Sequence, residues 1–226
     1  MRVRSRTASI VWKACIVASG IVGLAMTSGL LDGTFDLRFL CMFTNLSNIA
    51  VAVYFICALV ALSHDKDLVT YAHIPKMVVT MGITLTFLIA HFMLSGMLTW
   101  GGTLHVDMLL LHYVVPIMTI LDWVLFDEKG LMGRKEPLIW TVEPLVYLAA
   151  VEVLVNVFGI SVGGGMGDSR YPYPFLDATS LGWPTVIGFI LAVFVAFIAL
   201  GSALTVLFWG RWAGSLLGAI EPSLNP

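Results

Sequence analysis

Six apolar runs, separated by charged residues and turn formers, constrain this chain more than any other feature. Each holds roughly 20 residues, enough to cross the ~30 Å hydrocarbon core of a bilayer as an α-helix. The runs lack the alternating ten-residue pattern of barrel strands. We therefore predict an all-α polytopic membrane protein, a bundle of six transmembrane helices, over the approximate ranges 8–31, 39–62, 77–99, 107–126, 138–158 and 181–209.

The composition agrees with this class. Hydrophobic residues make up 59% of the 226 residues and charged residues 12%, with a mean hydropathy of +0.95. Soluble domains carry about 25% charged residues, so we expect one transmembrane domain over residues 1–226. The net charge of −2 and the absence of a basic run argue against a nucleic-acid partner. Three cysteines inside apolar runs suggest neither a disulfide framework nor a metal site.

Lysine and arginine predict the orientation, because cytoplasmic loops of membrane proteins are enriched in them. Arg38 and Arg170 fall on one side of the predicted spans. The other side collects Arg2, Arg4, Arg6, Lys13, Lys66, Lys76, Lys129, Arg134, Lys135 and Arg211. Both termini are therefore expected in the cytoplasm. Asp122 and Glu143 then belong to the inner half, where we expect them to pair with cations such as Lys76, Arg134 and Lys135.

Four predicted helices place polar groups in one layer of the outer leaflet. Counting ~1.5 Å per residue, Thr44 and His112 lie about 7 Å from the outer ends of their helices, Glu152 about 9 Å and His91 about 12 Å. Ionisable side chains in spans are costly and indicate a functional site by default. Thr, Ser and Asn more often join helices by hydrogen bonds, so the whole layer, and not one residue, carries the hypothesis.

Nucleophilic catalysis is the enzyme chemistry that this layer favours. A threonine hydroxyl needs a neighbouring base, and neutral histidine is the usual one. Thr44 with His112 meets that requirement, although Ser47, Ser95 and Tyr113 compete as the nucleophile and His91 as the base. Asn45 and Asn48 are candidate oxyanion donors. Glu152, Asp107, or His91 through a water could orient the histidine.

Two other classes remain open. A proton-coupled transporter or channel would use His91, His112, Glu152 and Asn156 as a relay. A single-haem protein would be ligated by His91 and His112. The zinc-protease motif H-E-x-x-H is absent, and no lysine lies deep enough in a span for a retinal Schiff base. For the hydrolase we expect neither metal nor cofactor.

The last connection, from about residue 159 to 180, carries the most distinctive loop. Its glycines suit a loop at the membrane surface, and its aromatic residues favour the interface. The segment from Tyr171 to Asp177, with Tyr173 and Phe175, is predicted to be a lid over the outward opening; an interfacial aromatic belt without a gating role is the alternative.

Three motifs together resemble a known family. They are Met42-Phe43-Thr44-Asn45-Leu46-Ser47-Asn48, His112-Tyr113-Val114-Val115-Pro116 with Leu121-Asp122-Trp123, and Tyr171-Pro172-Tyr173-Pro174-Phe175-Leu176-Asp177. The chain is similar in these motifs, and in the order of its six spans, to the androgen-induced-gene and ADTRP membrane proteins. The resemblance implies a hydrolase of fatty acid esters of hydroxy fatty acids, in the inner membrane of a bacterium. It further implies Thr44 as nucleophile, His112 as base and a lipid from the bilayer as substrate.

Overall fold

A computed structural model describes residues 3–66, 68–93, 104–128, 135–163 and 169–220. Within these ranges the chain is helical and has no β-strand, and six helical segments are long and apolar enough to span a membrane. This confirms the predicted all-α class and the six predicted spans. The segments are α1 (Arg6–Thr27), α2 (Phe43–Ser63), the Ala72–Met93 part of α3 (Leu68–Met93), Val106–Phe126, Glu136–Val157 and the Trp183–Val206 part of α9 (Trp183–Ile220).

Two of these segments are composite. The fourth joins α4 (Val106–Leu109), the π-helical turn η4 (Leu110–Val114) and α5 (Val115–Phe126). The fifth joins α6 (Glu136–Ile139), α7 (Val142–Glu152) and a second π-helical turn, η5 (Val153–Val157). The connection to α9 contains the short helices η6 (Pro174–Leu176) and α8 (Ala178–Leu181).

Local turn chemistry moves several predicted boundaries. The first helix ends at Thr27, and not at residue 31, because Gly29 has a φ of +72° that a helix does not allow. The second begins at Phe43, and not at residue 39, since Asp36 instead caps the 3₁₀ turn η1 (Leu37–Cys41). The predicted end of the third run, residues 94–99, lies outside the described residues.

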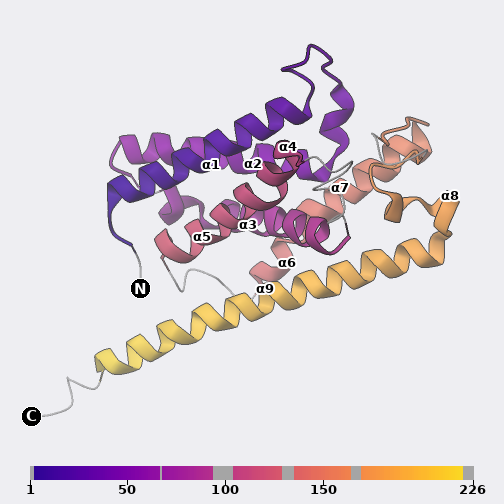
Figure 1. Cartoon of the computed structure of the whole chain (residues 1–226). Helices are drawn as coiled ribbons and strands as arrows, with labels where there is room; N and C mark the ends of the chain where they lie inside the picture. The colour runs from indigo at the N-terminus through magenta and orange to yellow at the C-terminus, as the bar shows by residue number, and fades with distance from the viewer. Residues whose placement is uncertain (1–2, 67, 94–103, 129–134, 164–168, 221–226) are drawn as a thin grey trace, which may run out of the picture.

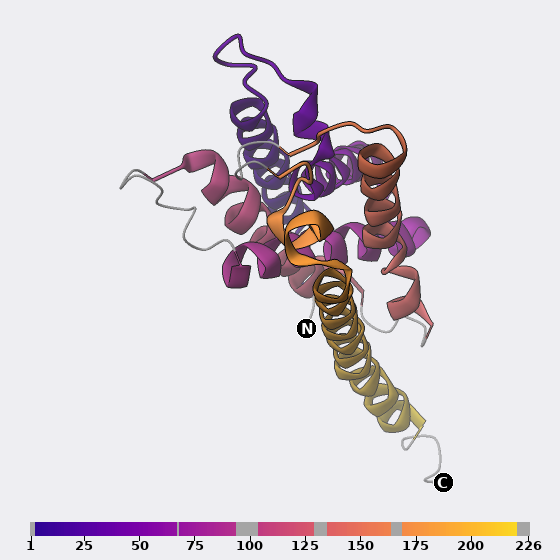
Figure 2. The ribbon, with the colours of Figure 1, turned by 90° about the vertical axis from the view of Figure 1, so that its right-hand side faces the viewer.

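Helices α1, α2, α3 and α5 pack against one another, whereas α9 runs along the edge of this bundle (Figures 1 and 2). Of the 18 residues that form the most apolar stretch of α3, 56% are buried inside the protein. For the corresponding stretch of α9 the share is only 17%. Helix α1 begins and α9 ends on the same side of the bundle (Figure 1). The beginning of α1 also meets the end of α2, where Arg6 pairs with Asp65.

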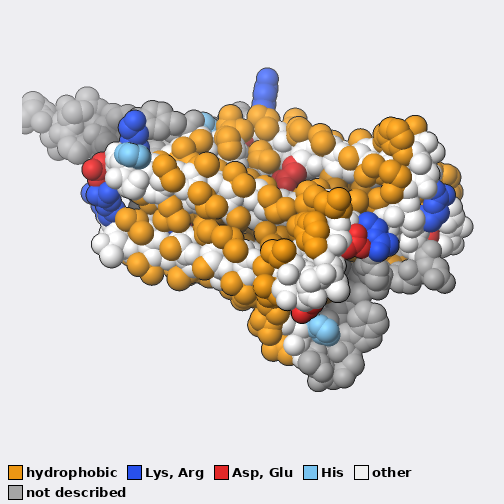
Figure 3. All heavy atoms as spheres, turned by 90° about the horizontal axis from the view of Figure 1, so that it is seen from above, with side chains coloured by type: hydrophobic (Ala, Val, Ile, Leu, Met, Phe, Trp, Pro, Cys, Tyr) orange, Lys and Arg blue, Asp and Glu red, His pale blue; other side chains and the backbone are white. Residues whose placement is uncertain are grey.

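The exterior suits a lipid environment. Figure 3 shows hydrophobic side chains over most of the visible face, with Lys and Arg mainly near its ends. Val146 on α7 and Val195 on α9 remain 62% and 65% exposed. An apolar exterior of this extent is unusual for a soluble monomer but ordinary for helices in contact with lipid.

A buried ion cluster joins three helices of the bundle, α1, α3 and α5. Asp122 on α5 is fully buried and accepts hydrogen bonds from Lys13 on α1, at 2.7 Å, and from Lys76 on α3. The Nζ of Lys76 also lies 3.8 Å from Asp127. This confirms the predicted pairing of Asp122 with Lys76, and adds Lys13 to it.

For Glu143 the described residues show no such pair. Its Oε2 has no hydrogen-bond partner among the described residues, because the carboxylate lies in a notch on α3 that Gly82 leaves open. A second notch is found at Gly201 on α9, where an added Cβ would come within 2.8 Å of the Trp140 ring. The first notch brings α3 and α7 close together, and the second brings α9 close to the end of α6. Arg134, the other predicted partner, lies outside the described residues.

Candidate active site

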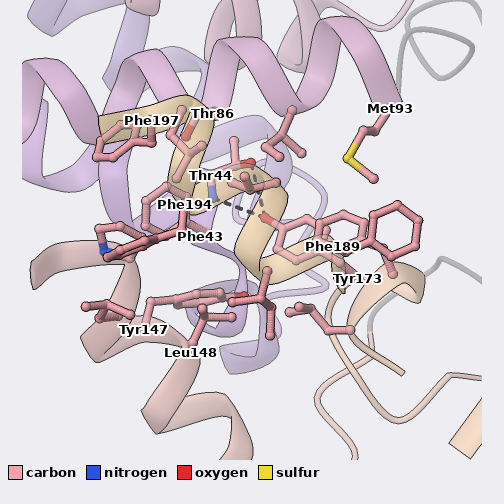
Figure 4. A pocket seen from close by; sticks show the side chains of 18 of the residues that line it. Phe43, Thr44, Thr86, Met93, Tyr147, Leu148, Tyr173, Phe189, Phe194 and Phe197 are labelled. Carbon is pink, nitrogen blue, oxygen red and sulfur yellow. Dashed lines mark hydrogen bonds between the residues drawn. The ribbon is translucent and has the colours of Figure 1, made fainter. Parts of the chain in front are cut away.

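An apolar pocket lies between α3, α7, α9 and the η6 loop (Figure 4). Its wall is almost entirely hydrophobic, and its few polar groups include the hydroxyls of Thr44, Thr86 and Tyr173 and the imidazole of His112. The apolar part of the lining consists chiefly of Phe43, Leu85, Ile89, Leu148, Phe189, Val193, Phe194 and Phe197. Pockets with apolar walls and a few convergent polar groups are typical binding sites.

Thr44 lies in the first turn of α2 and is 8% exposed. Its backbone is fixed by two neighbours on the same helix, since both Ser47 Oγ and Asn48 Nδ2 donate to the Thr44 carbonyl, at 3.1 and 2.8 Å. Asn48 also donates to the carbonyl of Leu111, at 3.0 Å. The threonine is therefore held at a defined position against the helix that carries His112.

His112 lies within the π-helical turn η4, which ends two residues before Pro116. Proline lacks an N–H and cannot continue the regular hydrogen-bond ladder, which accounts for a wider turn here; such turns often occur at functional sites. The Nδ1 of His112 lies 3.1 Å from the carbonyl oxygen of Met108. Because a carbonyl only accepts, Nδ1 is the protonated nitrogen, and Nε2 of the neutral ring is free to accept.

The two residues meet at hydrogen-bond distance, with Thr44 Oγ1 3.2 Å from His112 Nε2. The tautomer set by Met108 makes the threonine hydroxyl the donor and the imidazole the acceptor. A hydroxyl, a base that can take its proton and a third group that orients the base form the arrangement of an activated nucleophile.

Tyr173 is the third polar side chain at this point (Figure 4). Its hydroxyl oxygen accepts from the backbone N–H of Thr44, at 3.3 Å, and lies 3.4 Å from Thr44 Oγ1. Burial raises the pKa of the Tyr173 phenol above its ordinary value, so the group stays protonated at neutral pH and can donate. The residue is 7% exposed.

The loop that carries Tyr173 is tied down on both sides. Upstream, the Tyr171 hydroxyl accepts from Asn156 and donates to Glu152, so the predicted site residue Glu152 anchors the loop to α7. Downstream, Asp177 caps α8 through the backbone N–H groups of Thr179 and Ser180. Of the predicted lid residues, Tyr173 and Phe175 line the pocket, and Tyr171 and Asp177 hold the loop.

The predicted oxyanion donors have other partners. The Asn45 amide donates to the carbonyl of Phe39, at 2.8 Å, and both donors of Asn48 go to backbone carbonyls. Ser47 donates to Thr44 and contacts Thr86 Oγ1 at 2.8 Å. These three residues surround the site as a scaffold.

Asp107 and His91 have other contacts. Asp107 accepts from Thr27 Oγ1, at 2.9 Å, which connects α4 to the end of α1. His91 is exposed and stacks on Phe87, with ring centroids 5.8 Å apart. Ser95, the remaining competitor, lies outside the described residues.

Sequence reasoning did not assign Tyr173 to the polar centre. A signal was present, because a tyrosine between two prolines in an otherwise apolar loop brings a hydroxyl into a rigid segment. The depth of that hydroxyl depends on how the loop folds back, which helical periodicity does not predict. Comparisons of the chain with protein-family profiles, curated proteins and solved structures give no match.

Proposed function

We propose that this protein is an intramembrane lipid ester hydrolase, with Thr44 as nucleophile and His112 as general base. The observation that carries the proposal is the 3.2 Å contact between Thr44 Oγ1 and His112 Nε2 in the wall of an apolar pocket. A reactive hydroxyl paired with an imidazole supports acyl transfer, and the hydrophobic lining supports an acyl chain as ligand.

In the first half of the reaction, Thr44 Oγ1 attacks the carbonyl carbon of the ester, and its proton passes to His112 Nε2. The carbonyl π electrons move onto the oxygen, giving a tetrahedral intermediate. When this collapses, the bond to the leaving alkoxide breaks and His112 returns the proton to that oxygen. An alcohol departs, and the acyl group stays on Thr44 as an ester.

The negative charge on the tetrahedral oxygen needs a donor, and Tyr173 supplies it in this proposal. Its oxygen accepts the Thr44 N–H, which leaves its O–H available for the substrate. The hydroxyl also lies at the N-terminal end of α2, where the helix dipole favours negative charge. Fixed donors in a water-poor site are usually the largest single contribution to such catalysis.

In the second half, water attacks the acyl-threonine. His112 takes a proton from that water and gives it to Thr44 Oγ1 as the carbon–oxygen bond breaks. A fatty acid leaves and the threonine is regenerated. No group other than water is consumed, so the cycle is balanced with the residues present.

The substrate is inferred to come from the bilayer, and the site to lie in its outer half. This follows from the predicted orientation, in which Lys and Arg place both termini in the cytoplasm, and from the position of Thr44 in the first turn of α2. The resemblance noted above adds a bacterial inner membrane as the location and fatty acid esters of hydroxy fatty acids as one candidate class of substrate.

The test uses the purified protein in detergent with a p-nitrophenyl fatty ester. Thr44→Val keeps the shape of the side chain but removes the nucleophile, and we expect kcat to fall by about 10³-fold or more. His112→Gln should cost about 10²–10⁴-fold, the usual contribution of a general base.

Two further variants complete the test. Thr44→Ser retains a hydroxyl and should keep part of the activity. Thr84→Val removes a buried hydroxyl of the same kind on α3 and should leave kcat unchanged. Among the described residues, this hydroxyl bonds only the Thr80 carbonyl, at 2.6 Å. Full activity in Thr44→Val would refute the proposal.

A further inference from the structure

We propose that the pocket measures the length of the acyl chain, accepting chains of about eight carbons and discriminating against much longer ones. This inference rests on the proposed hydrolase function and goes beyond it, because it names the class of substrate. It is carried by two contacts at the inner end of the pocket, one between α3 and α7 and one between α9 and the residues at the end of α6.

The closure is built from two contacts. On α9, Phe197 lines the pocket, and one turn deeper Gly201 is in contact with the Trp140 ring. An added Cβ at Gly201 would lie 2.8 Å from Cζ3 of that ring, and Trp140 is fully buried. No room for a chain is left between α6 and α9 below Phe197.

The second contact closes the side between α3 and α7. Thr86 lines the pocket, and one turn deeper on the same face of α3 is Gly82, against which the Glu143 carboxylate lies. Glu143 precedes Tyr147, another lining residue, by one turn of α7. Pro144, the next residue on α7, still lines the pocket, so the contact between Gly82 and Glu143 marks the inner end of the pocket on this side.

The usable length follows from the register of the helices. Ser47 meets Thr86 at 2.8 Å, so Thr44, one turn outward on α2, lies at about the level of Ile89 on α3. From Ile89 to the closure at Gly82 the helix rises ~10 Å. An extended carbon chain advances ~1.2 Å per bond, so about eight bonds fit between the carbonyl and the floor.

The outer end of the pocket has no such closure. Met93 at the end of α3 is 38% exposed and Phe189 near the beginning of α9 is 40% exposed, although both line the pocket. Leu145 on the α7 wall also lines the pocket and is 43% exposed, whereas Phe197, next to the contact between Gly201 and Trp140, is 3% exposed. The acyl arm of the ester is therefore limited in length, whereas the alcohol arm can extend toward the open end.

The experiment measures hydrolysis of p-nitrophenyl esters from butyrate to palmitate. For the wild-type protein we expect the highest kcat/KM near the octanoate and a loss of about tenfold or more at the palmitate, because a chain too long for a packed pocket forces strain. Phe197→Ala removes one ring from the floor and should move the optimum about four carbons longer.

Two further variants test the same prediction in case Phe197→Ala does not fold, and two others are controls. Phe197→Leu should move the optimum in the same direction by less, and Leu85→Phe, which fills the inner half, should shorten it. Phe189→Ala makes the same substitution at the open end and should leave the optimum in place. Val195→Ala changes a lipid-facing residue that is 65% exposed and should change nothing.

A binding measurement separates this inference from the proposed function. Thr44→Val protein is titrated with the dansyl amide of octanoic acid, which is then displaced by unlabelled amides of increasing length. Length-dependent binding without hydrolysis by the wild-type protein would overturn the hydrolase and keep the length limit. Hydrolysis with equal kcat/KM from octanoate to palmitate, or an optimum unmoved in all three inner-end variants, would overturn the length limit alone.

Discussion

At the scale of single residues, the site depends on which hydrogen bonds are already used. The Met108 carbonyl fixes the protonated nitrogen of His112, and the Thr44 N–H occupies the oxygen of Tyr173. Each of these bonds leaves one complementary group directed at the reacting atoms. A site arranged in this way needs little reorganisation when negative charge develops in the proposed reaction.

The role of Tyr173 can be tested by removing a single atom. Tyr173→Phe keeps the ring in the pocket wall but deletes the hydroxyl, so we expect kcat to fall by about 10²–10³-fold, as for the loss of one oxyanion donor. KM should change much less, because the deleted contact forms only in the transition state. Steady-state kinetics on a p-nitrophenyl ester gives both values.

Tyr147→Phe provides the matched control. Tyr147 also lines the pocket, but its hydroxyl donates to the carbonyl of Cys41, at 2.9 Å, and not to Thr44. We expect a kcat near that of the wild type. Equal losses in the two variants would show that the Tyr173 hydroxyl acts through general packing and not on the oxyanion.

Part of the site could be anticipated from the sequence for a physical reason. Thr44 and His112 each lie a short distance from a helix end, and helical rise converts sequence position into depth. Depth alone did not distinguish His112 from His91, because the rotation of each helix in the bundle depends on packing. The hydrogen-bond partners of the Asn45 and Asn48 side-chain amides were also not predictable, since they depend on which backbone carbonyls the neighbouring segments bring within reach.

At the scale of helices, buried ion pairs hold α1, α3 and α5 together. Asp122 is shared by Lys13 and Lys76, and the Nζ of Lys76 also lies 4.3 Å from the Phe55 ring centroid. Buried pairs of this kind do not necessarily add stability compared with apolar residues, but removing one partner leaves a buried charge without compensation.

Asp122→Asn is therefore expected to destabilise the protein by about 3–5 kcal/mol. For a chain of this size each kcal/mol lowers Tm by roughly 2–4 °C, so thermal unfolding in detergent should show a shift of roughly 10 °C. Asp65→Asn, which breaks the exposed pair with Arg6, should cost no more than about 1 kcal/mol. Similar Tm values for the two variants would show that the ion pairs of Asp122 do not hold the three helices together.

The loop before α9 should weaken in acid. Hydrogen bonds from Thr179, Ser169 and Ser180 lower the pKa of Asp177 from 3.8 to about 2, with the Thr179 side chain as the largest cause. Because the folded pKa lies below the unfolded one, the carboxylate stabilises the fold above about pH 4, and this stabilisation is lost as the pH falls toward 2.

Asp177→Ala removes the cap and should cost about 1 kcal/mol at neutral pH. The difference in Tm between the wild type and this variant should shrink as the pH is lowered from 6 to 3. Ser161→Ala changes a residue in the same connection and should show no such pH-dependent difference. A gap in Tm that stays constant down to pH 3 would rule out the ionised cap.

At the scale of the whole molecule, the sequence was most informative. Length and hydropathy are sufficient for the number of spans, because the bilayer sets a minimum length and does not tolerate unpaired backbone groups. The helix ends were less predictable, as Gly29 and Asp36 show, since turn chemistry ends a helix inside an apolar run. The pocket could not be anticipated, because it depends on how far α9 lies from α3 and α7.

The predicted orientation gives a separate test in bacteria. With both termini in the cytoplasm, green fluorescent protein fused to the C-terminus should fluoresce and alkaline phosphatase at the same position should be inactive. Alkaline phosphatase fused after Gly163, on the opposite side, should be active. The reverse pattern would place the site in the inner leaflet.

Helix α9 contributes a wall of the pocket while most of its surface remains uncovered by protein. In a membrane, hydrocarbon tails can replace the contacts of such a wall at little cost, because they are as apolar as the side chains. If the proposed function holds, an ester dissolved among those tails would reach the threonine without crossing water. Turnover should then follow the mole fraction of substrate in the membrane, so that added inert phospholipid slows the reaction even when the total amount of ester is constant.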